Sequence, residues 1–409
     1  MSKPLDVVVV GAGLAGLTAT RALVKAGLNV KLIDSADRVG GRIKTDLVSG
    51  FRLDLGFQLF NPAYPAARKV LNISELELKK FRKGIRLVLD EEIVEFGRNP
   101  SDSWRFLQQF DKTALLNFAK YLITTVALTT DARKARSNVT AKQALLGACD
   151  DDDLVEDLLT PFLAGVFLES NLDVSRHWLD EVLRYFVLGS PGVPKNGMQE
   201  IPTQLTRGIT DFIQLNTIVT KVNANSVETS EGIISAKNVI IATDPNTTAS
   251  LLDLPNPIMR SVTTWYFSIK HRNRGPRTKL LAVDGSSNPG PLVNSVVLTD
   301  AARSYAPAGY DLIASSALGL QDEFDLSAIK SHTAILNTLN PADLELIASY
   351  QIPAALPQTN YDVKAVNDLA TTQIFVASDL LTSPSINGAI ESGQQVADRI
   401  LLNKLAEGN

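Results

Sequence analysis

The chain is poor in the side chains that build disulfide frameworks and most metal centres. Among its 409 residues there are three histidines and one cysteine, Cys149. A single cysteine forms no intrachain disulfide and is typical of a reducing compartment. The histidines, His177, His271 and His332, lack the close spacing of metal ligands. The sequence therefore predicts neither a zinc nor an iron site.

An excess of charge of either sign is also absent. The formal net charge is −4, which gives no reason to expect a nucleic-acid partner or a polybasic membrane anchor. The G-x-S-x-G motif does not occur, and this argues against a Ser–His–Asp hydrolase. The first strand-like run begins within a few residues of Met1 and leaves no room for a signal peptide, so we expect a cytoplasmic protein.

The longest apolar stretch falls short of a membrane span. Residues 113–130 are rich in apolar side chains, mostly leucine and alanine, but Lys120 interrupts them, and a span needs about 20 apolar residues. We expect a buried helix here. The alternatives are a helix that covers an apolar substrate cavity and a helix in peripheral contact with a membrane surface.

The N-terminus carries the pattern of a dinucleotide-binding fold. Val7–Val10 reads as a strand buried on both faces, and a helix-like run, Leu14–Ala26, follows it. Between them lie three glycines in a G-x-G-x-x-G frame, which allow a tight turn, close approach to a pyrophosphate and close helix packing. A second strand ends at Asp34, at the spacing of a ribose-binding acid. The predicted site residues are Gly11, Gly13, Leu14, Ala15, Gly16, Asp34 and Ser35. An ordinary Gly-rich turn would leave Asp34 unexplained.

A second motif follows directly. Gly40 and Gly41 are flanked by Arg38 and Arg42, and such a loop suits close approach to phosphate or ribose because guanidinium groups donate to anionic oxygens. Together with Asp34 this motif resembles the flavoprotein superfamily of monoamine oxidases, phytoene desaturases and protoporphyrinogen oxidases, which usually has Glu where this chain has Asp34. The resemblance implies that FAD is the cofactor.

The resemblance extends along the whole chain and implies further FAD contacts. It places Gly56, Phe57 and Gln58 beside the isoalloxazine ring and the backbone of Val219 against the adenine. Asp379 is expected to accept hydrogen bonds from ribityl or pyrophosphate-linked hydroxyls. The flavin pyrimidine edge is expected to face Ile386, Asn387, Gly388 and Ala389. Ser378 departs from the family, which usually has Gly before the acid.

These features predict an α/β fold with two domains, as in the amine oxidases. A Rossmann-like FAD-binding domain with a parallel sheet would comprise residues 1–75, 195–250 and 362–409. An α+β substrate-binding domain would comprise residues 76–194 and 251–361. In the second domain we expect a hairpin over 85–96, a helix over 325–339 and an antiparallel sheet built from 265–270, 279–283 and 292–298.

The expected function is FAD-dependent oxidation by hydride transfer to flavin N5. Residues 161–168, headed by the helix breaker Pro161, resemble the substrate wall of desaturase-like members. We therefore expect an apolar cavity lined by residues 113–168, with Phe167 among them, and a polyene, isoprenoid or porphyrinogen-like substrate. Burial in an ordinary core would also explain these apolar runs.

Other functions stay open. Amine oxidases of this superfamily carry paired aromatic residues before the flavin, and residues 340–378 offer no such pair, only Tyr350, Tyr361 and Phe375. A flavin-dependent isomerase or mutase without net redox change is a further alternative, and so is a lipid-binding escort protein without flavin. The electron acceptor and the oligomeric state do not follow from the sequence.

Overall fold

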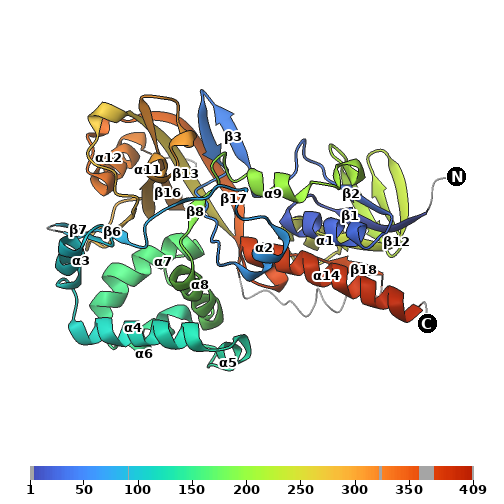
Figure 1. The fold of residues 1–409 in the computed structure, drawn as a ribbon, viewed down its shortest axis with the longest axis horizontal. Coiled ribbons are helices and arrows are strands. Elements are labelled where there is room, and N and C mark those ends of the chain that lie inside the picture. The colour runs from blue at the N-terminus through green and yellow to red at the C-terminus, as the bar shows by residue number, and fades with distance from the viewer. Residues whose placement is uncertain (1–3, 91, 322–324, 359–372, 408–409) are drawn as a thin grey trace.

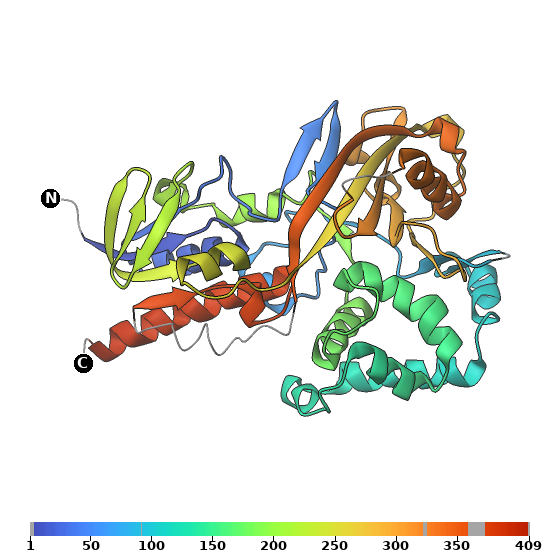
Figure 2. The ribbon, with the colours of Figure 1, turned by 180° about the vertical axis from the view of Figure 1, so that it is seen from behind.

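The computed structural model describes residues 4–90, 92–321, 325–358 and 373–407. They form two sheets of seven strands each, with a helical lobe beside the second sheet (Figure 1). Two long strands, β13 (Met259–Lys270) and β17 (Glu345–Pro357), run from the second sheet toward the first (Figure 2). The α/β class and the two-domain architecture expected from the sequence are confirmed. The predicted domain boundaries stay predictions, and the one at residue 362 lies outside the described residues, as does Tyr361.

The first sheet is parallel around its centre. Strand β1 (Leu5–Val10) pairs in parallel with both β2 (Val30–Ile33) and β12 (Gly232–Ile241). The remaining strands are β9 (Ile213–Gln214), β10 (Val219–Asn223), β11 (Ser226–Thr229) and β18 (Ile374–Val376). Val7 and Val9 belong to one apolar cluster, whereas Val8 and Val10 belong to another. The valine run is therefore buried on both faces, as expected for a central parallel strand.

Helices cover the face of the first sheet that carries Val7 and Val9. Helix α1 (Leu14–Lys25) lies beside the C-terminal helix α14 (Ile386–Glu407) (Figure 1). The smaller elements of this half are α2 (Pro65–Val70), α9 (Glu200–Leu205), α10 (Pro245–Leu251) and the hairpin of β3 (Thr45–Val48) and β4 (Phe51–Asp54). Strand β5 (Lys79–Lys80) pairs with β8 (Gly192–Val193).

The second sheet contains antiparallel pairings of the three expected strands, but one parallel pair makes the sheet mixed. The predicted hairpin is present as β6 (Ile85–Val88) and β7 (Ile93–Phe96), and β6 pairs in parallel with β14 (Leu281–Asp284). Almost 200 residues separate these two strands, so no tight turn fixes their direction. The other strands are β15 (Asn294–Val297) and β16 (Tyr310–Leu318), and helices α11 (Leu298–Ala301) and α12 (Leu326–Asn337) complete this half.

The helical lobe contains the long apolar stretches of the sequence. Its helices are α3 (Pro100–Leu107), α4 (Lys112–Ala127), α5 (Thr130–Lys134), α6 (Ala141–Cys149), α7 (Thr160–Phe167) and α8 (Arg176–Leu188). The Asp111 carboxylate caps α4 by accepting from Thr113 N and Ala114 N. Within the described chain, no helix is long and apolar enough to cross a bilayer.

We expected Pro161 to break a helix, but the structure shows a helix that continues through this residue. A π-helical turn over Leu154–Leu159 runs directly into α7, and Pro161 falls in the first turn of α7. Because a π-turn shifts the hydrogen-bond pattern by one residue, the helix tolerates a proline that has no N–H to donate. The chain therefore enters residues 162–167 as one continuous helix.

Candidate active site

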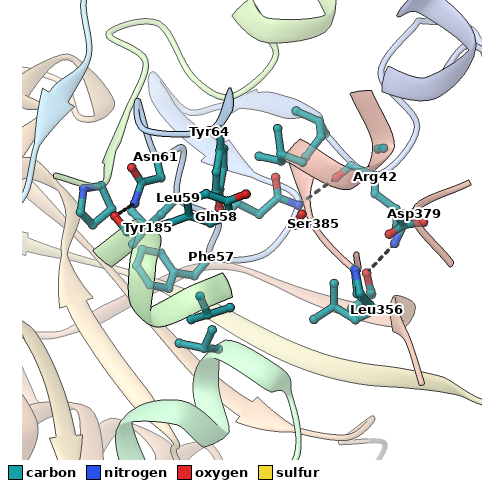
Figure 3. Close-up of a pocket in the computed structure, with 18 of the residues that line it drawn as sticks. Arg42, Phe57, Gln58, Leu59, Asn61, Tyr64, Tyr185, Leu356, Asp379 and Ser385 are labelled. Atoms are coloured by element: carbon teal, nitrogen blue, oxygen red, sulfur yellow. Dashed lines mark hydrogen bonds and ion pairs between the residues drawn. The ribbon is translucent and has the colours of Figure 1, made fainter. Parts of the chain in front are cut away.

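One large cavity connects the first sheet with the helical lobe. Its volume is about 1310 Å³, above the ~300–1,000 Å³ of ordinary ligand pockets. It begins at the carboxyl ends of β1 and β2, where ligands of open parallel sheets bind. It then passes Arg42, Gln58 and Tyr64 and ends among α3, α4, α7 and α8. Figure 3 shows its middle section.

Most of the predicted site residues converge on this cavity, although they come from distant parts of the chain. Those that line it are Gly11, Gly13, Leu14, Ala15, Asp34, Ser35, Gly40, Gly41, Arg42, Phe57, Gln58, Val219, Asp379, Ile386 and Ala389. Those that do not line it are Gly16, Arg38, Gly56, Asn387, Gly388 and Phe167.

The glycines after β1 have different physical roles. Gly11 has a φ of +106°, and a Cβ there would lie 2.5 Å from the Ala242 carbonyl oxygen. A Cβ on Gly16 would lie 1.9 Å from the Gly11 oxygen, so Gly16 lets α1 pack against the turn. A Cβ on Gly13 would meet no atom of the described chain within 4 Å, although Gly13 lines the cavity. Glycine at that position keeps the space clear for a ligand.

Asp34 fixes the turn from the end of β2. Its carboxylate accepts from Ala12 N at 2.5 Å and from Ala36 N at 2.7 Å. Each carboxylate oxygen has a second lone pair, so Asp34 retains acceptor capacity toward the cavity. This arrangement suits a carboxylate that both holds the glycine turn and receives ribose hydroxyls.

Two arginines of the second motif point in different directions. The Arg42 guanidinium donates to Asp379 at 2.7 Å and to the Ala355 carbonyl at 3.0 Å (Figure 3). Arg38 instead pairs with Asp46 and donates to the Thr45 carbonyl. Because these partners occupy its guanidinium and it does not line the cavity, Arg38 is placed to hold β3 rather than to contact a ligand.

Gln58 presents a free acceptor. Its Nε2 donates to the carbonyls of Arg42 and Leu55 at 2.9 and 3.1 Å. Its Oε1 is buried and has no hydrogen-bond partner in the described chain. A buried orphan acceptor costs about 1–3 kcal/mol, and a bound flavin with its ring N–H group would remove that cost. Gly56 lies in the same segment and has a φ of +80°. A Cβ at this position would lie 2.6 Å from an Ile352 methyl, so only glycine fits there.

The start of α14 closes the middle of the cavity. Ile386 and Ala389 line it, while Asn387 turns away and its Oδ1 accepts from Ala66 N at 2.9 Å. Gly388 packs so closely that a Cβ would lie 2.0 Å from the Ser383 oxygen. Ser378, the departure from the family pattern, has extended backbone (φ −149°) that requires no glycine, and its hydroxyl accepts from Leu380 N.

A buried carboxylate anchors the strand that leads to Gln58. Asp54 accepts from Thr45 Oγ1 at 2.5 Å, Met198 N at 2.9 Å and Tyr305 OH at 2.9 Å. Burial raises the pKa of Asp54 to about 6, although these hydrogen bonds oppose the shift. The anchor joins β4 to β3, to the segment before α9 and to the short helical turn Arg303–Tyr305.

The far arm of the cavity is apolar. Its walls come from α3, α4, the π-turn, α7 and α8, and include Phe106, Leu115, Phe118, Leu122, Leu159, Phe162, Val166, Val182 and Phe186. Phe167 is not among them. It is fully buried in the lobe core, with its ring centroid 4.7 Å from that of Trp178. Phe162 and Val166 lie on the neighbouring face of the same helix, and that face borders the cavity.

Several polar residues of the cavity do not feature in the sequence prediction, among them Asn61, Tyr64, Glu181 and Tyr185. Glu181 accepts from Tyr185 OH at 2.8 Å and from Ser383 Oγ at 3.3 Å. Burial raises the pKa of Glu181, and the two hydrogen bonds oppose that shift. The sequence signal was weak, because a Glu–Tyr pair four residues apart is also ordinary on an exposed helix face.

Comparison with known proteins identifies the family. The model for flavin containing amine oxidoreductases matches residues 14–337, and the chain belongs to that family. Polyamine oxidase 4 of Oryza sativa subsp. japonica is 27% identical over 257 residues, covering 60% of this chain and 52% of the relative. An L-amino-acid oxidase of Trimeresurus stejnegeri is 25% identical over 249 residues, covering 56% and 46%. The chain thus spans about half the length of these curated relatives.

Solved structures share the fold at low identity. Putrescine oxidase bound to putrescine superposes with a TM-score of 0.71 at 20% identity, covering 97% of this chain and 99% of that one. An oxidoreductase from Methanosarcina mazei superposes with a TM-score of 0.73 at 16% identity, covering 96% of this chain and 100% of that one. Reduced UDP-galactopyranose mutase superposes with a TM-score of 0.68 at 15% identity, covering 98% of this chain and 96% of that one.

The residues present fit the family's flavin cofactor. The open space at Gly13, the carboxylate of Asp34, the Arg42–Asp379 pair and the orphan Oε1 of Gln58 all face one cavity. They would hold phosphate, ribose, ribityl and ring atoms of FAD respectively.

Proposed function

We propose that the protein is an FAD-dependent oxidoreductase whose substrate is an apolar small molecule, such as a polyene, an isoprenoid or a porphyrinogen-like compound. The observation that carries this proposal is the continuity of one cavity from the dinucleotide motifs into an arm walled by apolar side chains. Bound FAD supplies a two-electron acceptor for hydride from a substrate C–H bond.

The residues of the chain would position the substrate and exclude water. Transfer of apolar surface into such an arm is favourable by roughly 25 cal/mol per Å², which favours an extended hydrocarbon over a polar molecule. Two arginines, Arg42 and Arg82, line the cavity. Arg42 is paired with Asp379, and Arg82 donates to the Arg98 carbonyl. An anionic sugar nucleotide would find few free guanidinium groups, so a mutase substrate fits the arm poorly.

Amine oxidation is the second candidate. Some relatives are named as amine or amino-acid oxidases, and Glu181 is a carboxylate in the cavity without an ion-pair partner among the described residues. The aromatic pair of such enzymes has no counterpart on β17 or β18. Tyr350 donates to Asp46 and Phe375 is buried in the core, and neither lines the cavity.

The experiment is an anaerobic screen of the flavin-loaded protein. We expect an apolar substrate from the three classes to bleach the flavin absorbance, whereas polyamines and amino acids do not. Bleaching by an amine alone would overturn the proposal in favour of the second candidate. Turnover that requires reduced flavin but consumes no acceptor would instead indicate redox-neutral chemistry.

A matched pair of phenylalanines tests the arm itself. Phe162→Asp places a carboxylate on the cavity wall and is expected to abolish binding of farnesyl methyl ether, an isoprenoid probe without a hydrogen-bond donor, while the flavin spectrum persists. Phe162→Leu, which keeps the wall apolar, is the control. Phe167→Ala removes a core ring and is expected to cost about 3–5 kcal/mol of stability. Unchanged ether binding by the Phe162→Asp variant would contradict the placement of the substrate.

A further inference from the structure

The cavity contains a small polar site, between its middle section and the apolar arm, whose hydrogen-bonding capacity is only partly used within the described chain. Glu181 on α8 and Tyr64 before α2 both line the cavity. Oε1 of Glu181 accepts from Tyr185 and Ser383, and Oε2 has no hydrogen-bond or ion-pair partner among the described residues. The hydroxyl of Tyr64 likewise has no partner in the described part of the chain. One acceptor and one hydroxyl are therefore available to a ligand.

The two groups are held next to each other by three segments of the chain. The rings of Tyr64 and Tyr185 meet edge to face, with centroids 5.0 Å apart and an interplanar angle of 84°. Asn61 Nδ2 donates to the Tyr185 carbonyl at 2.8 Å, and Asn387 Nδ2 donates to the Tyr185 hydroxyl at 3.4 Å. Glu181 is close enough to Tyr64 for its charge to raise the pKa of that phenol, in addition to the larger effect of burial. Figure 3 shows Tyr64, Tyr185 and Asn61 together at one side of the cavity.

We propose that Glu181 and Tyr64 bind a hydroxyl group of the substrate, so that the substrate is an alcohol with an apolar body. This inference rests on the proposed function and names its substrate class. A hydroxyl both donates and accepts, so it can donate to Oε2 of Glu181 while it accepts from Tyr64. The apolar body then extends along Phe162 and Val166.

Two other head groups match the site less well. An ammonium only donates, and its desolvation in an apolar cavity costs far more than that of a neutral hydroxyl. A carbonyl only accepts, so it would satisfy Tyr64 and leave the Glu181 carboxylate without a donor. A hydroxyl gives a partner to both Glu181 Oε2 and the Tyr64 hydroxyl. Its hydrogen bond to the carboxylate is stronger than a hydrogen bond between two neutral groups.

The test measures dissociation constants for three probes that share one apolar body: farnesol, farnesyl methyl ether and farnesylamine. Each is titrated against the oxidised, FAD-loaded protein. A hydrogen bond to a charged group contributes about 1.5–3 kcal/mol, so the wild-type protein is expected to bind farnesol at least about tenfold more tightly than the ether. Glu181→Leu is expected to bring the ratio close to one, because farnesol then loses the acceptor for its hydroxyl proton. Tyr64→Phe removes a donor from which both oxygens can accept, so it is expected to weaken the binding of farnesol and of the ether together.

A neighbouring tyrosine–carboxylate pair provides the control. Tyr121 OH donates to Asp180 at 2.5 Å, but neither residue lines the cavity. Tyr121→Phe makes the same chemical change as Tyr64→Phe but lies outside the cavity, so it is expected to bind both farnesol and the ether as the wild-type protein does. If Glu181→Leu does not fold, Glu181→Gln decides the question, because it replaces the charged acceptor by a neutral amide of nearly the same size and is expected to lower the ratio.

The remaining outcomes each overturn the inference. Equal binding of alcohol and ether by the wild-type protein, or an unchanged ratio in Glu181→Leu, removes the hydroxyl site while the apolar-substrate proposal stands. A farnesylamine preference that Glu181→Leu abolishes indicates a cation site. If Tyr64→Phe and Glu181→Leu both alter the flavin spectrum of the ligand-free protein, and Glu181→Leu leaves the farnesol-to-ether ratio unchanged, the pair is assigned to the cofactor. Failure of the ether itself to bind rejects the proposed function, and the inference with it.

Discussion

Arg42 and Asp379 form an ion pair of 2.7 Å although 337 positions separate them in the sequence. Asp379 is almost fully buried, and Arg42 also donates to the Ala355 carbonyl. The pair therefore joins the second sequence motif, the C-terminal motif and the long strand β17 at one point of the cavity.

This pair should matter for both FAD retention and stability. Asp379→Asn keeps the shape of the side chain but leaves the Arg42 charge without its counter-ion. Because truncating one partner of a buried pair costs about 3–5 kcal/mol and Arg42 is partly exposed, we expect a smaller loss, of about 1–3 kcal/mol, with weaker FAD binding. Thermal unfolding and flavin titration measure both. Wild-type behaviour in both measurements would show that the pair is incidental.

Gly13 and Gly16 should respond oppositely to alanine. Gly13→Ala adds a Cβ into open cavity space, so the apoprotein should keep its melting temperature while FAD affinity falls. Gly16→Ala drives a Cβ into the Gly11 carbonyl, so the apoprotein itself should lose stability. Scanning calorimetry of the two flavin-free variants separates the effects. A destabilised Gly13→Ala apoprotein, or a stable Gly16→Ala one, would refute the assigned roles.

Asp34 and Asp244 both border the cavity, but we expect only Asp34 to be essential for FAD. Asp244 caps α10 by accepting from Asn246 N and Thr247 N, so Asp244→Ala should cost about 1 kcal/mol of stability. Asp34→Ala should lower FAD affinity by roughly tenfold or more, since charged hydrogen bonds contribute about 1.5–3 kcal/mol. Flavin content after gel filtration compares the two, and equal losses would count against the placement of Asp34.

The buried carboxyl of Asp54 should make stability depend on pH. Burial raises its folded-state pKa to about 6 from an ordinary value of 3.8, so the native state binds the proton more tightly than the unfolded state. The resulting stabilisation, about 3 kcal/mol, is fully present below pH 3.8 and is lost as the pH rises through about 6.

Asp54→Asn isolates this effect. Its Oδ1 can accept from Thr45 and Met198 N, and its amide can donate to the Tyr305 oxygen. The difference in unfolding free energy between the variant and the wild type should grow in favour of the variant from pH 4 to pH 7. A constant difference over that interval would show that Asp54 does not titrate there.

The local parts of the fold could be predicted because short-range pattern determines them. The valine run, the glycine turn and the acid at the end of β2 each specify their own geometry, and the structure forms them at the expected residues. The parallel pairing of β6 with β14 could not be predicted, since strand alternation carries no information on the partner's direction.

The cavity walls show the same limit. Phe162 and Phe167 are equally apolar residues of one helix, and periodicity separates their faces without telling which one borders a cavity. Glu181 and Tyr64 are 117 positions apart, and only the folded chain brings them to one site. By contrast, the flavin motifs were visible because each consists of neighbouring residues.

The central claim is that this cavity holds FAD, and the most direct measurement is the flavin content of the protein purified without added cofactor. The account predicts a yellow protein with a flavin absorption spectrum and one FAD, rather than NAD, released per chain on denaturation. A colourless protein that cannot be reconstituted with FAD would contradict it.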